Sequence, residues 1–126
     1  MDETDFREYV ARFNDRDYEG FGEFYAEDVV FELGDRQRME GRDAILSFYR
    51  EVHERIEESL SVERVIVGED GLAAELTTEF RAIEDWEEFV GGPMEEGDSV
   101  EFVSFVHYHV DDGQFTHVKS ARFKEL

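Results

Sequence analysis

Residues 42–82 read RDAILSFYREVHERIEESLSVERVIVGEDGLAAELTTEFRA, and the spacing of the apolar residues changes within this stretch. The first part repeats apolar side chains at helical intervals, which predicts a helix over residues 42–58. From residue 60 the apolar side chains alternate with polar ones, which predicts strands over residues 60–68 and 71–84. The intervening Glu69-Asp70-Gly71 is a turn sequence, so the two strands should form a hairpin.

The segment before this stretch predicts two more helices and a strand. Aromatic residues at helical spacing favour a helix over residues 3–16, with Thr4 as its cap, and Asp17 caps a short second helix. Val29 to Leu33 then form a strand that Gly34 ends, and residues 35–41 form a polar loop.

The C-terminal part predicts a second hairpin from residues 99–110 and 114–124. Asp111-Asp112-Gly113 supplies a three-residue turn between them. Helices first and long antiparallel strands afterwards indicate an α+β fold, with the helices packed on one face of a curved sheet.

Composition limits the class of protein. The chain has 126 residues, which is the length of one domain, and its 40% hydrophobic residues are sufficient for a core. It contains no cysteine and no apolar run as long as a membrane span, and Met-Asp-Glu-Thr-Asp does not resemble a secretory leader. We therefore expect a cytoplasmic protein.

The charge is strongly negative. Asp and Glu number 34 against 13 Lys and Arg, giving a formal charge of -21, and only two of the basic residues are lysines. Such a field repels phosphate backbones and anionic lipids, so no nucleic acid or membrane partner is expected. Acids spread over every segment resemble proteins of salt-in halophiles, where molar salt screens the repulsion.

Three motifs point to a family. They are Phe24-Tyr25-Ala26-Glu27-Asp28-Val29 before the first strand, Gly41-Arg42-Asp43-Ala44-Ile45 with Phe48-Tyr49 in the long helix, and Asp112-Gly113 before the last strand. With the order of elements, they resemble the nuclear-transport-factor-2-like superfamily and its SnoaL-like group, whose relatives include polyketide cyclases and ketosteroid isomerases. The resemblance covers residues 1–126 as a single domain. It implies a cone, in which three helices from the N-terminal half and the concave face of a mixed sheet enclose an apolar pocket.

The resemblance also suggests where catalytic residues would lie. Ketosteroid isomerases use an aspartate base with a tyrosine and a protonated aspartic acid as oxyanion donors. The tyrosine position falls on Tyr9, with Tyr49 as a supporting tyrosine, but the two acid positions fall on Leu33 and Val106. Neither side chain can carry a proton, so this isomerase mechanism is not expected. The nearest acid, Glu32, should point to the opposite face of its strand.

Strand alternation selects the rest of the pocket. On residues 72–82 the even positions form the apolar row and should face the core. If the last strand keeps the phase that the resemblance implies, Ser120 and Arg122 also face the pocket. An inward Arg122 would need an anionic partner, either an acid of the chain or a ligand. With no cofactor expected, the candidate catalytic residues are Tyr9, Tyr49 and Arg122, and the candidate ligand-binding residues are Phe13, Phe31, Leu33, Phe48, Thr78, Phe80, Phe102, Ser104, Val106 and Ser120.

The opposite face of the strand over residues 99–110 carries Val103, Phe105, His107 and His109, a half-apolar row that suits a homodimer through the convex sheet. A three-residue turn would place His107 opposite His117, with His109 on the same face and diagonal to His117. A two-residue Asp112-Gly113 turn would shift the register and dissolve this cluster. A zinc or nickel site is conceivable there, but an interface or solvated cluster is commoner, and no metal is assigned. His53 is expected on the surface.

Two functions remain open at this point. The first is an enzyme that binds a compact, largely apolar ligand in the cone and performs proton transfer, cyclisation or hydrolysis. The second is a noncatalytic dimeric binding module whose pocket its own side chains fill.

Overall fold

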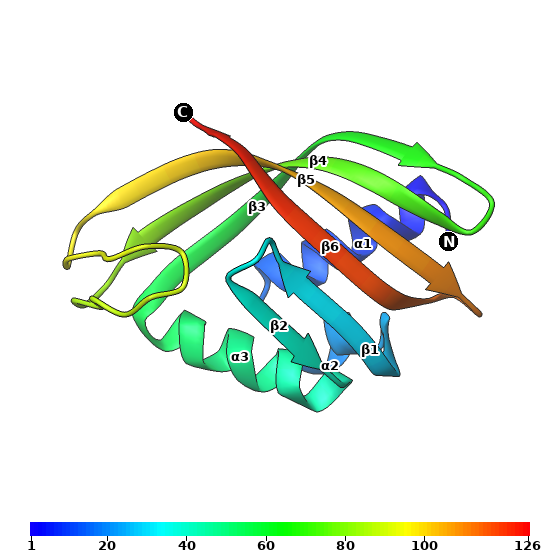
Figure 1. Ribbon diagram of the computed structural model, residues 1–126, viewed down its shortest axis with the longest axis horizontal. Coiled ribbons are helices and arrows are strands. Elements are labelled where there is room, and N and C mark those ends of the chain that lie inside the picture. The colour runs from blue at the N-terminus through cyan, green and yellow to red at the C-terminus, as the bar shows by residue number, and fades with distance from the viewer.

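The computed structural model describes residues 1–126 and contains three helices and one six-stranded sheet (Figure 1). This arrangement confirms the predicted α+β class. In chain order the elements are α1 (Glu3–Asn14), α2 (Tyr18–Gly22), β1 (Tyr25–Leu33), β2 (Gln37–Glu40), α3 (Arg42–Arg55), β3 (Ile56–Val67), β4 (Gly71–Ala82), β5 (Ser99–Asp111) and β6 (Gln114–Glu125). No helix is long and apolar enough to cross a membrane.

The sheet is mixed and strongly curved. Its strand order is β2-β1-β6-β5-β4-β3, and β1 runs parallel to β6 while all other neighbours are antiparallel. The helices lie on its concave side, and α3 runs along the open edge below β1 and β2 (Figure 1). This is the cone that the motifs predicted.

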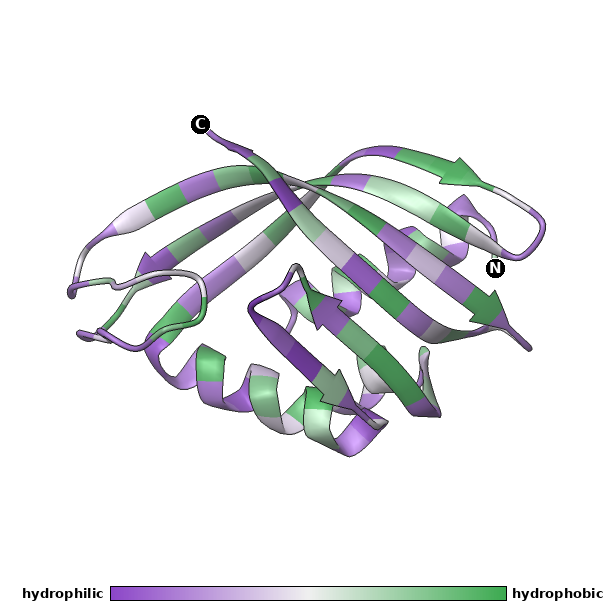
Figure 2. Cartoon of the chain, in the orientation of Figure 1, coloured by the Kyte–Doolittle hydropathy of each residue, from purple (hydrophilic) through white to green (hydrophobic).

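Strand alternation sets which residues form the core. The even positions of β4 from Leu72 to Ala82 are all buried, as predicted, and polar and apolar residues alternate visibly along the long strands (Figure 2). Leu72, Ala74 and Leu76 belong to the same core cluster as aromatic side chains of α1, α2 and β1. At the centre, Tyr9 and Tyr25 are fully enclosed and their hydroxyl oxygens lie 2.6 Å apart.

Several element ends differ from the prediction. The N-cap of α1 is Asp2, which forms a reciprocal capping box with Asp5, so Thr4 lies inside the helix. The loop predicted over residues 35–41 contains the short strand β2, and β1 begins at Tyr25. The differences at β1 and β2 reflect pairing with neighbouring strands, and the cap reflects the side-chain hydrogen bonds of Asp2 and Asp5. The sequence period alone reveals neither.

The most consequential difference is at the end of α3. The helix stops at Arg55, and β3 begins at Ile56 with no connecting residue. Ile56 is fully buried and pairs with Ala82, while the Ile83 N–H donates to the Arg55 carbonyl. The predicted helix end at residue 58 was therefore wrong, because residues 56–58 pair with β4 as part of β3.

The turn between β5 and β6 has two residues, which is the shorter of the two loop lengths that the sequence left open. Asp112 and Gly113 have φ of 51° and 74°, the left-handed geometry of a tight hairpin turn. A register shift after His109 then pairs His109 with His117 and His107 with Lys119. The expectation that this register dissolves the histidine cluster was wrong, because the ring centroids lie 4.7 Å apart for His107–His109 and 5.5 Å apart for His109–His117.

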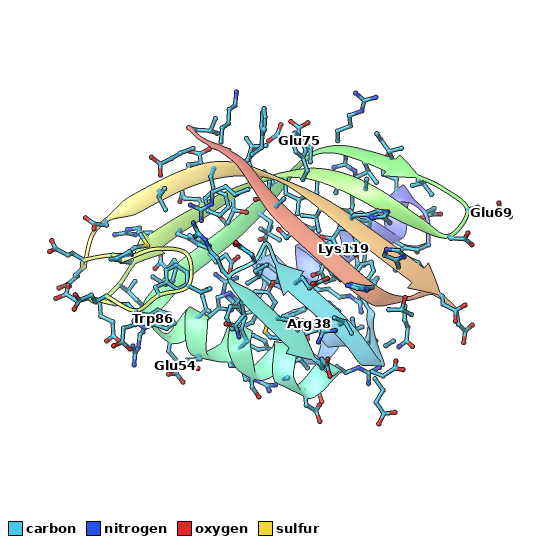
Figure 3. The ribbon with its side chains drawn as sticks, in the orientation of Figure 1. Arg38, Glu54, Glu69, Glu75, Trp86 and Lys119 are labelled. Carbon is cyan, nitrogen blue, oxygen red and sulfur yellow. The ribbon has the colours of Figure 1, made fainter.

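Acidic side chains project from widely separated parts of the molecule, such as Glu54 on α3, Glu69 at a hairpin tip and Glu75 on the sheet (Figure 3). We predict that the melting temperature rises between about 0.1 and 3 M KCl, because the Debye length falls from about 10 Å to below about 3 Å. Thermal denaturation followed by circular dichroism measures this. A constant melting temperature across the series would contradict the halophilic interpretation of the composition.

Candidate functional site

A pocket of about 360 Å³ lies between the concave face of the sheet and α3. Its walls combine aromatic and aliphatic side chains with a small number of polar groups, which is typical of sites for small molecules. The lining residues are Leu33, Gly34, Asp35, Arg36, Phe48, Tyr49, Val52, Glu58, Phe80, Phe89, Val90, Gly91, Phe102, Ser104, Ser120, Ala121 and Arg122. We call this the cone pocket.

Glu58 is the most unusual side chain in the cone pocket. It is 9% exposed and is the one buried carboxylate among the 34 acidic residues of the chain. The residue lies on β3 opposite Phe80, in phase with buried Ile56, so strand alternation turns it inward. Burying a carboxylate is unfavourable unless it is paired, so a partner is required.

That partner is His53, from the last turn of α3. The His53 Nε2 atom lies 3.0 Å from Glu58 Oε1, and the Tyr18 hydroxyl lies 2.7 Å from His53 Nδ1. The carboxylate can only accept, so the Nε2–H of His53 donates to it. In the neutral ring, Nδ1 then accepts from the Tyr18 hydroxyl. The predicted surface position of His53 was wrong, because its side chain is only 5% exposed.

Aromatic rings fix the histidine in place. Tyr49 stacks on the His53 ring at a centroid distance of 5.7 Å, and Phe13 meets it edge-on at 5.5 Å. The Glu58 carboxylate is thereby oriented through Oε1, whereas its Oε2 has no hydrogen-bond partner in the chain. One oxygen of a buried carboxylate thus remains free at the pocket wall.

Tyr49 supplies a hydrogen-bond donor beside this carboxylate. Its hydroxyl forms no hydrogen bond within the chain, and the residue is 7% exposed and lines the cone pocket. Burial, reinforced by the tyrosine Tyr9 and the negative Glu58, raises the pKa of Tyr49 well above its usual value. The Tyr49 hydroxyl therefore stays protonated at neutral pH and can donate to a ligand oxygen.

Arg122 has no ion-pair partner in the chain. Its guanidinium carbon lies 3.7 Å from the centroid of the Phe102 ring, and one N–H donates to the Gly91 carbonyl at 3.4 Å. Burial and the charge of Arg36 lower the pKa of Arg122. The guanidinium remains charged, since an arginine does not lose its proton in proteins. The sequence left two anionic partners open for Arg122, an acid of the chain or a ligand. No acid of the chain forms an ion pair with it.

The other sequence candidates divide into two groups. Those that line the cone pocket are Leu33, Phe48, Phe80, Phe102, Ser104 and Ser120, together with Tyr49 and Arg122. Phe13, Phe31, Thr78 and Val106 lie in the packed interior and do not line it. Tyr9 lies beneath the pocket, where its hydroxyl is bonded to Tyr25.

The histidines of β5 and β6 lie outside the cone pocket. His117 Nε2 pairs with Glu32 Oε2 at 2.7 Å, which confirms that Glu32 points away from the pocket. The His109 Nε2 atom is buried without a hydrogen-bond partner, and burial lowers the pKa of this ring. No group of three or more potential ligands is arranged to hold a metal ion.

A second cavity, of about 640 Å³, is a groove on the outer face of the sheet. It is larger than the cone pocket, but it contains no buried polar group and its walls include exposed charged side chains such as Arg64 and Lys119. Chemistry on a small molecule needs oriented groups sheltered from water, so we place the candidate site in the cone pocket.

The structure predicts strong coupling between His53 and Glu58. His53→Phe keeps the ring packing but leaves the carboxylate unpaired, and should cost about 1–3 kcal/mol of unfolding free energy. Adding Glu58→Met removes the stranded charge, so the double variant should be less destabilised than the sum of the two single variants. Urea denaturation in high salt measures all four proteins. Strictly additive effects would contradict the pairing.

Comparison with known proteins supports the fold and identifies the family. The SnoaL-like domain family matches residues 6–118 of the chain. A search among curated proteins gave no match.

Solved structures resemble the chain over nearly its whole length. A candidate polyketide cyclase from Xanthomonas campestris pv. campestris is 26% identical, with a TM-score of 0.80 over 93% of this chain and 86% of that one. A candidate polyketide cyclase from Silicibacter sp. has 19% identity and a TM-score of 0.83 over 95% and 87%. An LEH-like epoxide hydrolase from M. tuberculosis has 15% identity and a TM-score of 0.77 over 95% and 80%.

The last two are too distant in sequence to indicate more than a shared fold. The family match extends over most of the chain and agrees with the cone and its topology. The chain belongs to the SnoaL-like domain family.

Proposed function

We propose that this protein binds a compact, largely apolar ligand in the cone pocket and catalyses proton transfer on it, with Glu58 as the general base. The observation that carries this proposal is the single buried carboxylate, oriented through one oxygen by His53 and free at the other. A general base needs this arrangement, because it must hold a fixed orientation and still reach the substrate.

The remaining pocket groups suit the same chemistry. When Glu58 takes a proton from carbon or oxygen, negative charge develops on the substrate, and the Tyr49 hydroxyl is available to donate a hydrogen bond to it. Phe80, Phe89 and Phe102 supply apolar surface, at roughly 25 cal/mol per Å² buried. His53 acts as a positioning residue, since it touches Glu58 and does not line the pocket.

The substrate class follows from this chemistry. Proton removal beside a carbonyl group begins an aldol cyclisation, and the 26% identical neighbour is described as a candidate polyketide cyclase. We infer a carbonyl compound with a weakly acidic C–H bond as substrate. The proposed base, Glu58, lies on β3 and not at Leu33. The general base therefore occupies a different position from that in the ketosteroid isomerases that the motifs resemble.

A general-base probe tests the catalytic role without knowledge of the substrate. In 5-nitrobenzisoxazole a carboxylate removes the ring C–H proton while the N–O bond breaks, giving a cyanophenolate whose absorbance reports the rate. We predict that Glu58→Gln lowers kcat/KM at least about 100-fold, the usual contribution of a positioned base. Glu54→Gln, an exposed α3 residue with the same change in charge, should retain the wild-type rate. Equal rates for Glu58→Gln and wild type would refute the assignment.

An exposed apolar patch lies on the outer face of the sheet. Such a patch suits a dimer interface, either of an enzyme or of a noncatalytic interaction module. Phe105 and Phe123 are 45% and 59% exposed, with ring centroids 4.9 Å apart, and Ile66 lies in the adjoining groove at 57% exposure. Val103, from the row predicted to form the interface, is already buried within the chain. We propose that this patch forms a homodimer.

Light scattering in high salt tests the dimer. The wild type should have twice the chain mass, and Phe105→Asp should be monomeric because the interface would then have to bury a charge. Ile83→Asp, another exposed apolar residue but outside the patch, should leave the dimer intact. A monomeric wild type would contradict the proposal that this patch is an interface between two copies of the chain.

A further inference from the structure

Two arginines share one wall of the cone pocket. Arg36 follows β1, and Arg122 lies on the neighbouring strand β6, so the parallel pairing of these strands brings the two together. Both residues are exposed, whereas Glu58 is buried. The cone pocket therefore has a cationic, solvent-facing end and a buried end that carries the base.

One loop fixes both guanidinium groups. Arg36 Nη1 donates to the Val90 carbonyl at 3.3 Å, and Arg122 Nη2 donates to the adjacent Gly91 carbonyl at 3.4 Å. The loop can lie this close to Phe80 because Gly91 has no Cβ atom. A Cβ at that position would lie 3.0 Å from the Phe80 ring. Each arginine uses one of its five N–H donors in the chain, so both retain donors for a ligand.

No carboxylate of the chain neutralises the two arginines. Asp35 lines the same pocket and Glu125 affects the pKa of Arg122, but neither forms an ion pair with either guanidinium. Some exposed arginines, such as Arg7 and Arg81, pair with carboxylates, and others, such as Arg64, do not. The pocket arginines differ in that two unpaired guanidinium groups line one pocket. Two like charges held together in this way favour an anion between them.

We infer that the natural ligand of the cone pocket is an amphipathic carboxylate, whose anionic group binds Arg36 and Arg122 while its apolar body extends past Phe102 toward Glu58. This inference rests on the proposed function, because it assumes that the ligand occupies the cone pocket.

The geometry supports carboxylate rather than a neutral polar group. A planar guanidinium presents paired N–H donors that match the two oxygens of a carboxylate. The Phe102 ring beneath Arg122 orients that plane and excludes water from one of its faces. Glu58 at the other end would repel a second anionic group, which favours a monoanion with its reactive part distant from its charge.

Two probes of nearly equal shape separate charge from apolar fit. 2-Naphthoate carries the carboxylate, and 2-naphthamide is its neutral counterpart. Their affinities are measured by isothermal titration calorimetry at one KCl concentration in which every variant gives a folded circular dichroism spectrum. The variants are Arg36→Gln, Arg122→Gln, the double variant and Arg64→Gln, the control, an exposed arginine of the outer groove that also has no ion pair.

The wild type should bind 2-naphthoate at least about fivefold more tightly than 2-naphthamide, since charge-assisted hydrogen bonds exceed neutral ones. Each pocket arginine variant should weaken naphthoate binding only, the double variant should lose the preference, and Arg64→Gln should keep it. Equal affinities in the wild type, or an equal loss in Arg64→Gln, would overturn the inference and leave pocket binding intact. Binding of neither probe would overturn the proposed function as well.

Discussion

The direct passage from α3 into β3 is the constraint on which the candidate site depends. A helix places His53 in its last turn, and a strand begins three residues later and points Glu58 to the same side. Buried Ile56 holds the junction between these two geometries by pairing with Ala82. Residues five apart in the sequence thereby form a buried hydrogen bond that neither a continuous helix nor a continuous strand would produce.

The surrounding core makes this pair rigid. Phe13 from α1 and Tyr49 from α3 enclose the His53 ring, and the hydroxyl of Tyr18, the first residue of α2, is hydrogen-bonded to its Nδ1 atom. All three helices therefore contribute to orienting one carboxylate. Side chains locked by packing hold a reactive group in position more accurately than a loop does.

The sequence predicted the architecture well and the site only in part. Alternation in β4 correctly identified the row that faces the core, because a period of two is a strong signal. Ser120 and Arg122 line the cone pocket, and their placement there came from the family resemblance. Glu58 and His53 were missed because both look like solvated polar residues at the end of an amphipathic helix. The detectable signal was Ile56, Glu58 and Leu60 at strand spacing, which continues the β3 pattern backward through the supposed helix end.

The protonation of His53 tests the central claim most directly. Nitrogen NMR of labelled protein at about pH 8 reports which ring nitrogen carries the proton. The account predicts a proton fixed on Nε2, toward Glu58, with Nδ1 accepting from Tyr18, and a change in the Nε2 signal in Glu58→Gln. A proton on Nδ1, or a solvent-averaged mixture of the two tautomers that is unchanged in Glu58→Gln, would contradict the pair and the base that depends on it.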